Sequence, residues 1–399
     1  MSENNQSLHL KYLTGLVNQP LEQWEGFYLT RADGMNFGLR FQLAFPVYAL
    51  YALAQVQPQR AEECAAAIER YIQKMLQPRV WAYWLQGALA TQHKSQPEGV
   101  RPTLVQGVVE TAHNRLGLSG GLLPLDPCQQ GNIQYSGHLA SMLGFYQLLS
   151  GDDRYNREGF RLIAEVEGEK VSFEYSYTQL VERIHQQMRE NHFGGVCCEP
   201  SRAYAACNNH ACISNILHDR LYGTNFAEAN AGWANWVERK MLTSAGAIPL
   251  PAPNGLLSVA YMPALKMAIP VSFNFTDAWG FAFMAAWHPV TVQQVYPRFR
   301  KRLKSSADGL KLNSVGINES MEISTEALNT AFALVLATEM GDTATAQGLH
   351  NYLDAHYNPL TENGLYYADA RPAPYVTALV ALADALPSSG SLNKLVNGF

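Results

Sequence analysis

Charged side chains are scarce in this sequence. Asp, Glu, Lys and Arg make up 16% of its 399 residues, while hydrophobic residues make up 47%. The formal net charge is −5, and the absence of a positive excess argues against nucleic acid as the main partner. Few charges and many apolar residues fit a large buried core, with further burial between subunits, so we expect a homo-oligomer.

Targeting and membrane-spanning segments are also missing. The first residues, from Met1 to Gln6, are polar, and no positively charged segment precedes an apolar run there. No uncharged apolar run reaches the roughly 18 to 20 residues that span a bilayer. We therefore expect a cytoplasmic protein with no membrane span. Six cysteines in a chain of this length do not form a disulfide framework, and we expect reduced thiols.

Several catalytic motifs are absent as well. The sequence has no Gly-rich phosphate loop, no Gly-x-Ser-x-Gly elbow and no His-Glu-x-x-His helix, which argues against nucleotide binding, serine hydrolysis and zinc proteolysis. Residues 197–212 hold four cysteines and His210, but the Cys-x2-Cys spacing of zinc sites is missing. We expect no metal and no cofactor.

What the sequence has in abundance is helix patterns. Aromatic residues three and four positions apart predict a buried helix over 37–56, and further helices are predicted over 60–76, 135–150, 275–288, 324–340, 349–356 and 376–386. Gly151, Gly223 and Gly341 end helices, and Thr or Asp follows to begin the next.

Strand patterns are almost absent outside 247–275, and we expect the tail after Pro387 to be frayed. These features predict an all-α ring of antiparallel helix hairpins, an α/α toroid. No linker divides the chain, so we expect one domain over residues 1–399, with a long irregular insertion at about 85–131.

Three residues are candidates for catalysis: His138, Cys198 and Cys207. Cys207 precedes an apolar helical pattern, and free N–H groups at a helix N-terminus favour a thiolate. Glu199 follows Cys198 and offers a base or a hydrogen-bond partner. Taken singly, each of the three also fits an ordinary buried core residue.

His138 lies near the start of the helix predicted over 135–150. Gln134 and Tyr135 place polar groups beside it. A titratable imidazole and two thiols from neighbouring helix starts can perform acid, base or covalent chemistry.

Short motifs spread from about residue 24 to residue 345 resemble the bacterial linalool dehydratase/isomerase family. They are Arg79-Val-Trp81 with Trp84, Asn132-Ile-x-Tyr-x-Gly-His-Leu139, Cys198-Glu-Pro200 with Cys207-Asn208, Asp219-Arg-Leu-x-Gly-Thr224, Ala278-Trp279, Tyr296-Pro-Arg-Phe299 and Glu339-Met-Gly-Asp342. Each motif is weak alone, but the ordered set, with its Cys-x8-Cys spacing, is specific.

The resemblance implies an (α/α)6 barrel, a homo-oligomeric ring and a cofactor-independent enzyme acting on a small apolar terpenoid alcohol. It also implies that His138, Cys198 and Cys207 line a hydrophobic pocket, where they exchange protons with the substrate. Phe41, Phe275 and Trp279 are then expected to shape that pocket.

The sequence departs from the family around this implied pocket. Thr14 stands where the family has an acid, Phe41 and Phe275 stand at tyrosine positions, and Gln134 stands at a methionine position. Asp277 is an additional carboxylate, and Asp33 is a candidate replacement for the lost acid.

We therefore expect a lyase or isomerase that dehydrates or isomerises a hydrophobic allylic alcohol, with a substrate different from linalool. One alternative is a cyclase that tailors a polyketide or alkaloid, with the insertion as a lid over a larger substrate. A second is a non-catalytic binder of apolar ligands. A third is a carbohydrate-active α/α toroid, which requires paired carboxylates.

Overall fold

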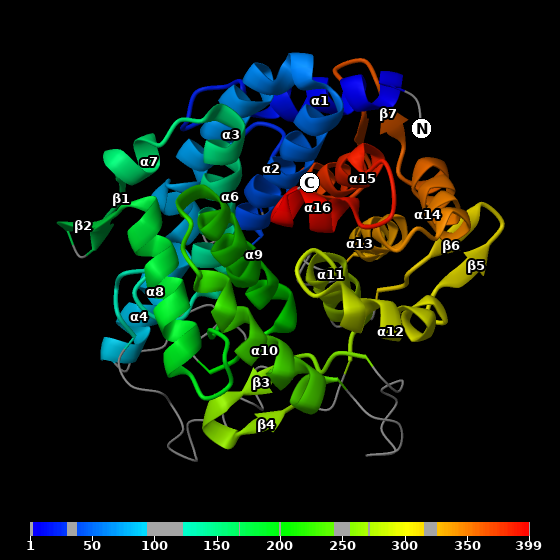
Figure 1. The fold of residues 1–399 in the computed structure, drawn as a ribbon. Coiled ribbons are helices and arrows are strands. Elements are labelled where there is room, and N and C mark those ends of the chain that lie inside the picture. The colour runs from blue at the N-terminus through cyan, green and yellow to red at the C-terminus, as the bar shows by residue number, and fades with distance from the viewer. Residues whose placement is uncertain are drawn as a thin grey trace.

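The computed structural model describes residues 3–29, 38–93, 123–166, 168–198, 201–242, 256–269, 272–314 and 325–398. The helices among them form a ring in two layers (Figure 1). In the described part of the chain, the inner layer consists of six helices: α2 (Leu39–Val56), α6 (Ile133–Ser150), α9 (Ala205–Tyr222), α11 (Asn274–Met284), α13 (Glu326–Glu339) and α15 (Ala373–Ala385). Each contacts the next, and α15 contacts α2, which closes the ring.

The outer layer alternates with the inner one along the chain. Its helices are α1 (Glu3–Val17), α3 (Ala61–Met75), α8 (Tyr177–Glu190), α10 (Asn230–Trp236), α12 (Pro289–Arg300) and α14 (Thr343–His356). Each outer helix precedes an inner helix, so the fold is the predicted all-α (α/α)6 barrel. Helices α4 (Pro78–His93), α7 (Arg154–Arg157) and α16 (Ser391–Asn397) are additional to the two layers.

The predicted glycine ends of three inner helices are confirmed, and the predicted cap after them is confirmed at one junction. Gly151, Gly223 and Gly341 follow α6, α9 and α13 with φ angles of 70°, 66° and 72°, in the left-handed region that glycine enters without steric cost. Asp342 then caps α14, because its side chain accepts a hydrogen bond from the Thr345 backbone N–H at 3.2 Å. Glycine therefore sets where each of these inner helices turns back.

The prediction of almost no strand outside 247–275 is wrong. Strands β1 (Phe160–Val166) and β2 (Glu169–Tyr175) form an antiparallel hairpin between α7 and α8. Buried and exposed residues alternate along β1, as expected for a strand with one face on the protein. Shorter pairs are β3 (Tyr261–Met262) with β4 (Met267–Ala268), β5 (Lys304–Ser306) with β6 (Gly309–Lys311), and β7 (Pro359–Leu360) with β8 (Tyr366–Tyr367).

Two further expectations need correction or restriction. The tail is not frayed: Leu392, Leu395 and Val396 of α16 are buried, and Arg220 of α9 donates two hydrogen bonds of 2.8 Å to its backbone. The long insertion begins as helix α4, and its residues 94–122 lie outside the described part of the chain.

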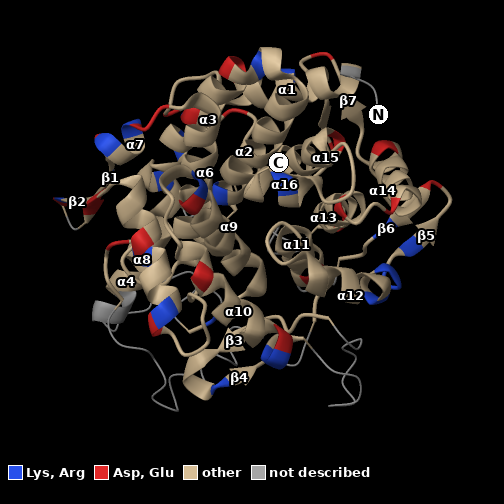
Figure 2. Ribbon diagram, viewed as in Figure 1, with Lys and Arg blue, Asp and Glu red and all other residues tan. Residues whose placement is uncertain are grey.

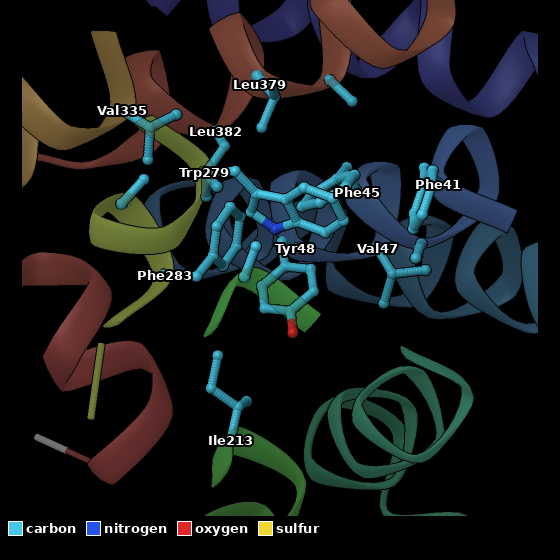
Figure 3. Packing of buried hydrophobic residues seen from close by; sticks show 14 of the residues in the cluster. Phe41, Phe45, Val47, Tyr48, Ile213, Trp279, Phe283, Val335, Leu379 and Leu382 are labelled. Carbon is cyan, nitrogen blue, oxygen red and sulfur yellow. The ribbon is translucent and has the colours of Figure 1, made fainter. Parts of the chain in front are cut away.

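Burial separates the two layers. Most charged residues lie on the outer helices and hairpins (Figure 2), while apolar and aromatic side chains from several inner helices meet at the centre of the ring (Figure 3). The residue pattern of α2 explains this, because every residue from 39 to 54 is buried and most are apolar. No described helix is both long and apolar enough to cross a membrane.

Candidate functional site

Helices α6 and α9 pack unusually close together because glycine lies between them. A Cβ atom on Gly137 would lie 3.2 Å from the Ala211 backbone nitrogen, and one on Gly144 would lie 2.9 Å from the Leu217 Cβ atom. Contacts this short leave no room for larger residues. The close approach brings His138 of α6 against His210 of α9.

The two imidazoles lie in close contact, tilted against each other. Their ring centres are 3.7 Å apart at an angle of 33°, and both side chains are fully buried. Phe41 and Phe45 of α2 meet the His138 ring edge to face at 5.5 and 5.4 Å, and Trp279 of α11 lies parallel to it at 6.1 Å. His138 is thus held by aromatic packing from three inner helices.

His210 is fixed in one neutral form by hydrogen bonds at both ring nitrogens. The Trp279 Nε1–H donates to His210 Nε2 at 3.2 Å, so the ring proton lies on Nδ1, which is 2.7 Å from the Tyr48 hydroxyl oxygen. Burial lowers the pKa of His210 to about 3. His210 therefore stays neutral and serves as a rigid surface for His138.

His138 differs from His210 because neither of its ring nitrogens has a hydrogen-bond partner among the described residues. Burial lowers its pKa well below 6.5, and the neighbouring His210 ring and the Arg40 guanidinium lower the pKa further. The result is an uncharged, fully buried imidazole whose two nitrogens lack partners among the described residues.

The loop that carries the two candidate thiols is held by Asn208. Its side-chain oxygen accepts from the Val196 N–H at 2.7 Å, and its amide donates to the carbonyls of Val196 and Tyr204 at 2.9 and 3.0 Å. Asn208 follows Cys207 directly, so these bonds fix the segment that leads to Cys198 against the start of α9.

Both thiols are buried, with Cys198 1% and Cys207 5% exposed. Cys207 is the third residue of α9, so the prediction that it lies at a helix N-terminus is confirmed. Cys198 donates its backbone N–H to the Arg202 carbonyl at 2.7 Å, and the carbonyl of Cys197 accepts from the Ile133 N–H at 3.2 Å, which joins the loop to the start of α6. None of the six cysteines, all of which are described, forms a disulfide.

A buried cation lies beside this site. Arg40 of α2 is 2% exposed and donates from Nη2 to the Gln134 side-chain oxygen at 2.7 Å. Gln134 lies one helical turn before His138 on α6. The guanidinium carbon is 4.5 Å from the ring centres of both Phe41 and Tyr83, which is within cation–π range.

Electrostatic effects on two tyrosines connect this cation with the thiols. Burial raises the pKa of Tyr83, the Arg40 guanidinium opposes that rise, and the thiols of Cys198 and Cys207 add to it. Burial likewise raises the pKa of Tyr375, where Cys207 adds to the rise and Arg40 opposes it. The cation, both thiols and two tyrosine hydroxyls therefore share one region of the ring.

The structure brings several predicted residues together around His138. Phe41 and Trp279 contact its ring as described above. Gln134 lies one turn before it on α6 and accepts a hydrogen bond from Arg40. Phe275 contacts Trp279 at 5.4 Å between ring centres, so it lies one residue further out.

Other predicted residues lie apart. Tyr135 is directed toward α3, because its hydroxyl donates to the Met75 carbonyl at 3.1 Å. Asp277 is bound by the Leu257 backbone N–H, the Ser272 hydroxyl and the Arg302 guanidinium. Burial raises its pKa to about 7, and Arg302 opposes that rise. Glu199 and Asp33 lie outside the described residues.

Sequence reasoning overlooked two functional candidates, His210 and Arg40. The sequence does indicate Arg40, because a lone cation in a helix of apolar and aromatic residues requires a partner. It does not indicate His210, because the contact of that ring with His138 depends on how α6 and α9 pack. No three His, Cys, Asp or Glu side chains among the described residues gather in a way that could hold a metal ion.

Two surface hollows of about 370 and 420 Å³ lie elsewhere on the molecule. The first is lined by residues of β2 and α8 together with Asp126, and the second lies between β5, β6, α12 and the start of α14. Neither includes a predicted site residue.

Solved structures share this fold at low sequence identity. The α-1,6-mannanase GH76A from Salegentibacter sp. HEL1_6 matches with a TM-score of 0.50 and 10% identity over 96% of this chain and 98% of that chain. A family 76 glycoside hydrolase from a bovine Bacteroides thetaiotaomicron strain matches with a TM-score of 0.52 and 10% identity over 96% of this chain and 76% of that one. These structural matches support a shared (α/α)6 fold. At such low sequence identity they say nothing about the substrate.

The sequence itself matches a family model over most of its length. The model of linalool dehydratase/isomerase covers residues 40–119 and 114–372. These ranges include the helices and the loop that carry the imidazoles, the thiols and the buried cation. The chain belongs to the linalool dehydratase/isomerase family.

Proposed function

We propose that this protein is a cofactor-independent lyase or isomerase in which His138, Cys198 and Cys207 exchange protons with a hydrophobic allylic alcohol. One observation carries the proposal: a fully buried imidazole whose two nitrogens have no partner among the described residues. Buried polar groups are normally satisfied, and leaving one unsatisfied is costly. A ligand that completes these hydrogen bonds gives His138 a role that core packing does not.

The groups present can carry out dehydration with balanced proton transfers. A thiol donates its proton to the substrate hydroxyl, and the C–O bond breaks with its electron pair to release water. The neutral His138 then removes a proton from the carbon next to the allylic cation, and those C–H electrons form the new double bond. Proton return from His138 to the thiolate restores the starting state. Isomerisation follows when water attacks the other allylic carbon instead and gives its extra proton to the thiolate, which restores the thiol.

The aromatic surroundings suit a cationic intermediate. The faces and edges of Phe41, Phe45 and Trp279 surround His138, and aromatic rings stabilise nearby positive charge. Their burial keeps bulk water away from the reactive carbon. The same arrangement would serve a cyclase acting on a polyketide or alkaloid, which remains the second candidate.

The experiment is product analysis by mass spectrometry on a panel of tertiary allylic alcohols and larger prenylated or polyketide substrates. We expect His138→Ala, Cys198→Ala and Cys207→Ala each to abolish a product that the unmodified protein forms. Cys64→Ala is the matched control, because Cys64 is a fully buried thiol on outer helix α3. A product lighter than the substrate by one water indicates dehydration, and one of equal mass indicates isomerisation or cyclisation.

Two outcomes would overturn the proposal. A product that survives all three substitutions would remove the imidazole and the thiols from the chemistry. A protein that binds substrates without turnover, and is indifferent to thiol alkylation, would be a binder of apolar ligands. A carbohydrate-active enzyme requires paired carboxylates, but the hydrogen bonds of Asp277 direct it to Arg302 rather than to His138.

A further inference from the structure

The guanidinium of Arg40 is a buried cation without a carboxylate. It is 2% exposed, and no Asp or Glu among the described residues forms an ion pair with it. Among the described residues, the guanidinium donates one hydrogen bond, to the neutral amide of Gln134, and its Nε and Nη1 atoms have no partner there. A charge removed from water in this way is strongly destabilised unless another group compensates it.

The protein holds this cation in a fixed orientation all the same. The rings of Phe41 and Tyr83 each lie 4.5 Å from the guanidinium carbon, and Gln134 fixes one N–H group. Tyr83 is in turn fixed by its hydroxyl, which donates to the Asn132 side chain at 2.6 Å. Stacked and hydrogen-bonded in this manner, the planar group is prepared for a partner of defined shape.

The geometry of the guanidinium defines that partner. Nη2 carries two N–H groups, one on each of the two bidentate edges of the side chain, and Gln134 accepts from only one of them. Because Nε and Nη1 are both unbonded, one whole edge keeps two parallel N–H groups. Two parallel N–H donors match the two oxygens of a carboxylate.

The position of Arg40 places that partner at the proposed reaction site. Gln134 precedes His138 by one turn of α6, and the Phe41 ring contacts both the guanidinium and the His138 ring. The centre of the same Phe41 ring lies 6.0 Å from the ring centre of Tyr375. A molecule whose anionic end binds Arg40 would therefore lie next to Phe41 and His138.

From these contacts we infer that the substrate is an amphipathic acid, a hydrophobic branched chain with a carboxylate that Arg40 binds through its open edge. The inference rests on the proposed function, because it names the substrate class of that same site. It also accounts for Gln134, whose amide oxygen orients the guanidinium. The aromatic rings around His138 then receive the hydrocarbon part.

The test compares citronellic acid with its methyl ester by isothermal titration calorimetry. Acid and ester share the hydrocarbon chain and differ in the anionic oxygen. We expect the unmodified protein to bind the acid at least about tenfold more tightly than the ester, since hydrogen bonds to charged groups commonly contribute that much. Arg40→Gln should lose the preference for the acid, and Arg40→Lys should keep part of it.

His138→Ala separates this inference from the proposed function. It keeps Arg40, so the preference for the acid should persist in a protein that cannot turn over substrate. If the protein prefers the acid but converts neither the tertiary allylic alcohols nor the larger prenylated or polyketide substrates, the proposed function fails and the acid-binding role stands. Equal binding of acid and ester, a preference that survives Arg40→Gln, or no binding of the acid at millimolar concentration would each overturn the inference.

Discussion

Arg40 and Lys74 are both buried cations, and replacing each by methionine should have different effects on stability. Lys74 of α3 is fully buried, and its ammonium donates to the carbonyls of Pro20, Leu21 and Gln23 at 3.3, 3.2 and 2.6 Å. Each hydrogen bond from a charged donor contributes about 1.5–3 kcal/mol. Because water can rebind the three carbonyls in the variant, the net destabilisation of Lys74→Met should be smaller than the sum, about 2–4 kcal/mol.

Arg40→Met loses only one such bond, the one to Gln134, which contributes about 1.5–3 kcal/mol. It also removes a buried charge without an acidic partner, and replacing such groups by apolar ones is neutral to stabilising by about 1–4 kcal/mol. The two effects roughly cancel, so the variant should be about as stable as the unmodified protein and more stable than Lys74→Met by about 3 kcal/mol.

Thermal unfolding by differential scanning calorimetry, with matched concentration and buffer and no ligand, measures this difference. We expect Lys74→Met to unfold several degrees below the unmodified protein and Arg40→Met to unfold close to its temperature. If Arg40→Met loses as much as Lys74→Met, the guanidinium is a structural element and the argument for a ligand at its open edge is wrong.

Three further predictions concern the thiol loop, the packing of α6 against α9, and a buried histidine with two carboxylate partners. Asn208→Ala should release the thiol loop, lowering kcat at least about tenfold and the unfolding temperature by several degrees, because three buried hydrogen bonds are lost; a lower unfolding temperature with unchanged kcat would indicate a purely structural role. Gly144→Ala should destabilise by about 1–3 kcal/mol in denaturant titration because its Cβ would meet Leu217, while Gly15→Ala, with open space, should not. Burial disfavours the charged form of His350, but its two carboxylate partners raise its pKa to about 10. That stabilisation should be complete below about pH 6.5 and lost as pH rises toward 10, and denaturant titrations of His350→Gln should show a flatter pH dependence.

The ring of helices was predictable because its signals are local. Aromatic spacing within 37–56 and the glycines after three helices each depend on a few neighbouring residues, and the structure confirms both. The β1–β2 hairpin was missed although its alternation is also local, because short alternating segments are easily outweighed by the helical patterns around them. The C-terminal helix α16 was missed because its order depends on contact with Arg220 of α9.

The site was predictable only in part. His138, Cys198 and Cys207 were found through motifs, and their assignment to catalysis is still a prediction. The separation of Tyr135 and Asp277 from His138 depends on tertiary partners, the Met75 carbonyl and Arg302, that no sequence spacing indicates. Hydrogen-bond competition of this kind decides where a polar side chain points, and it is set after the helices have packed.

The state of His138 gives a last prediction, on pH dependence. Its pKa is lowered far below 6.5 by burial first, and then by His210 and Arg40, so the imidazole is already neutral at pH 6.5 and above. A mechanism that uses it as a proton acceptor should therefore show no loss of kcat/KM centred near pH 6.5. We expect a flat profile from about pH 8 down to about pH 5.5, measured with stability checked at each pH. A limb centred near 6.5 that disappears in His138→Ala, on residual activity, would mean that His138 titrates as an ordinary exposed histidine, and that the close, dry contact with His210 does not persist in the working enzyme.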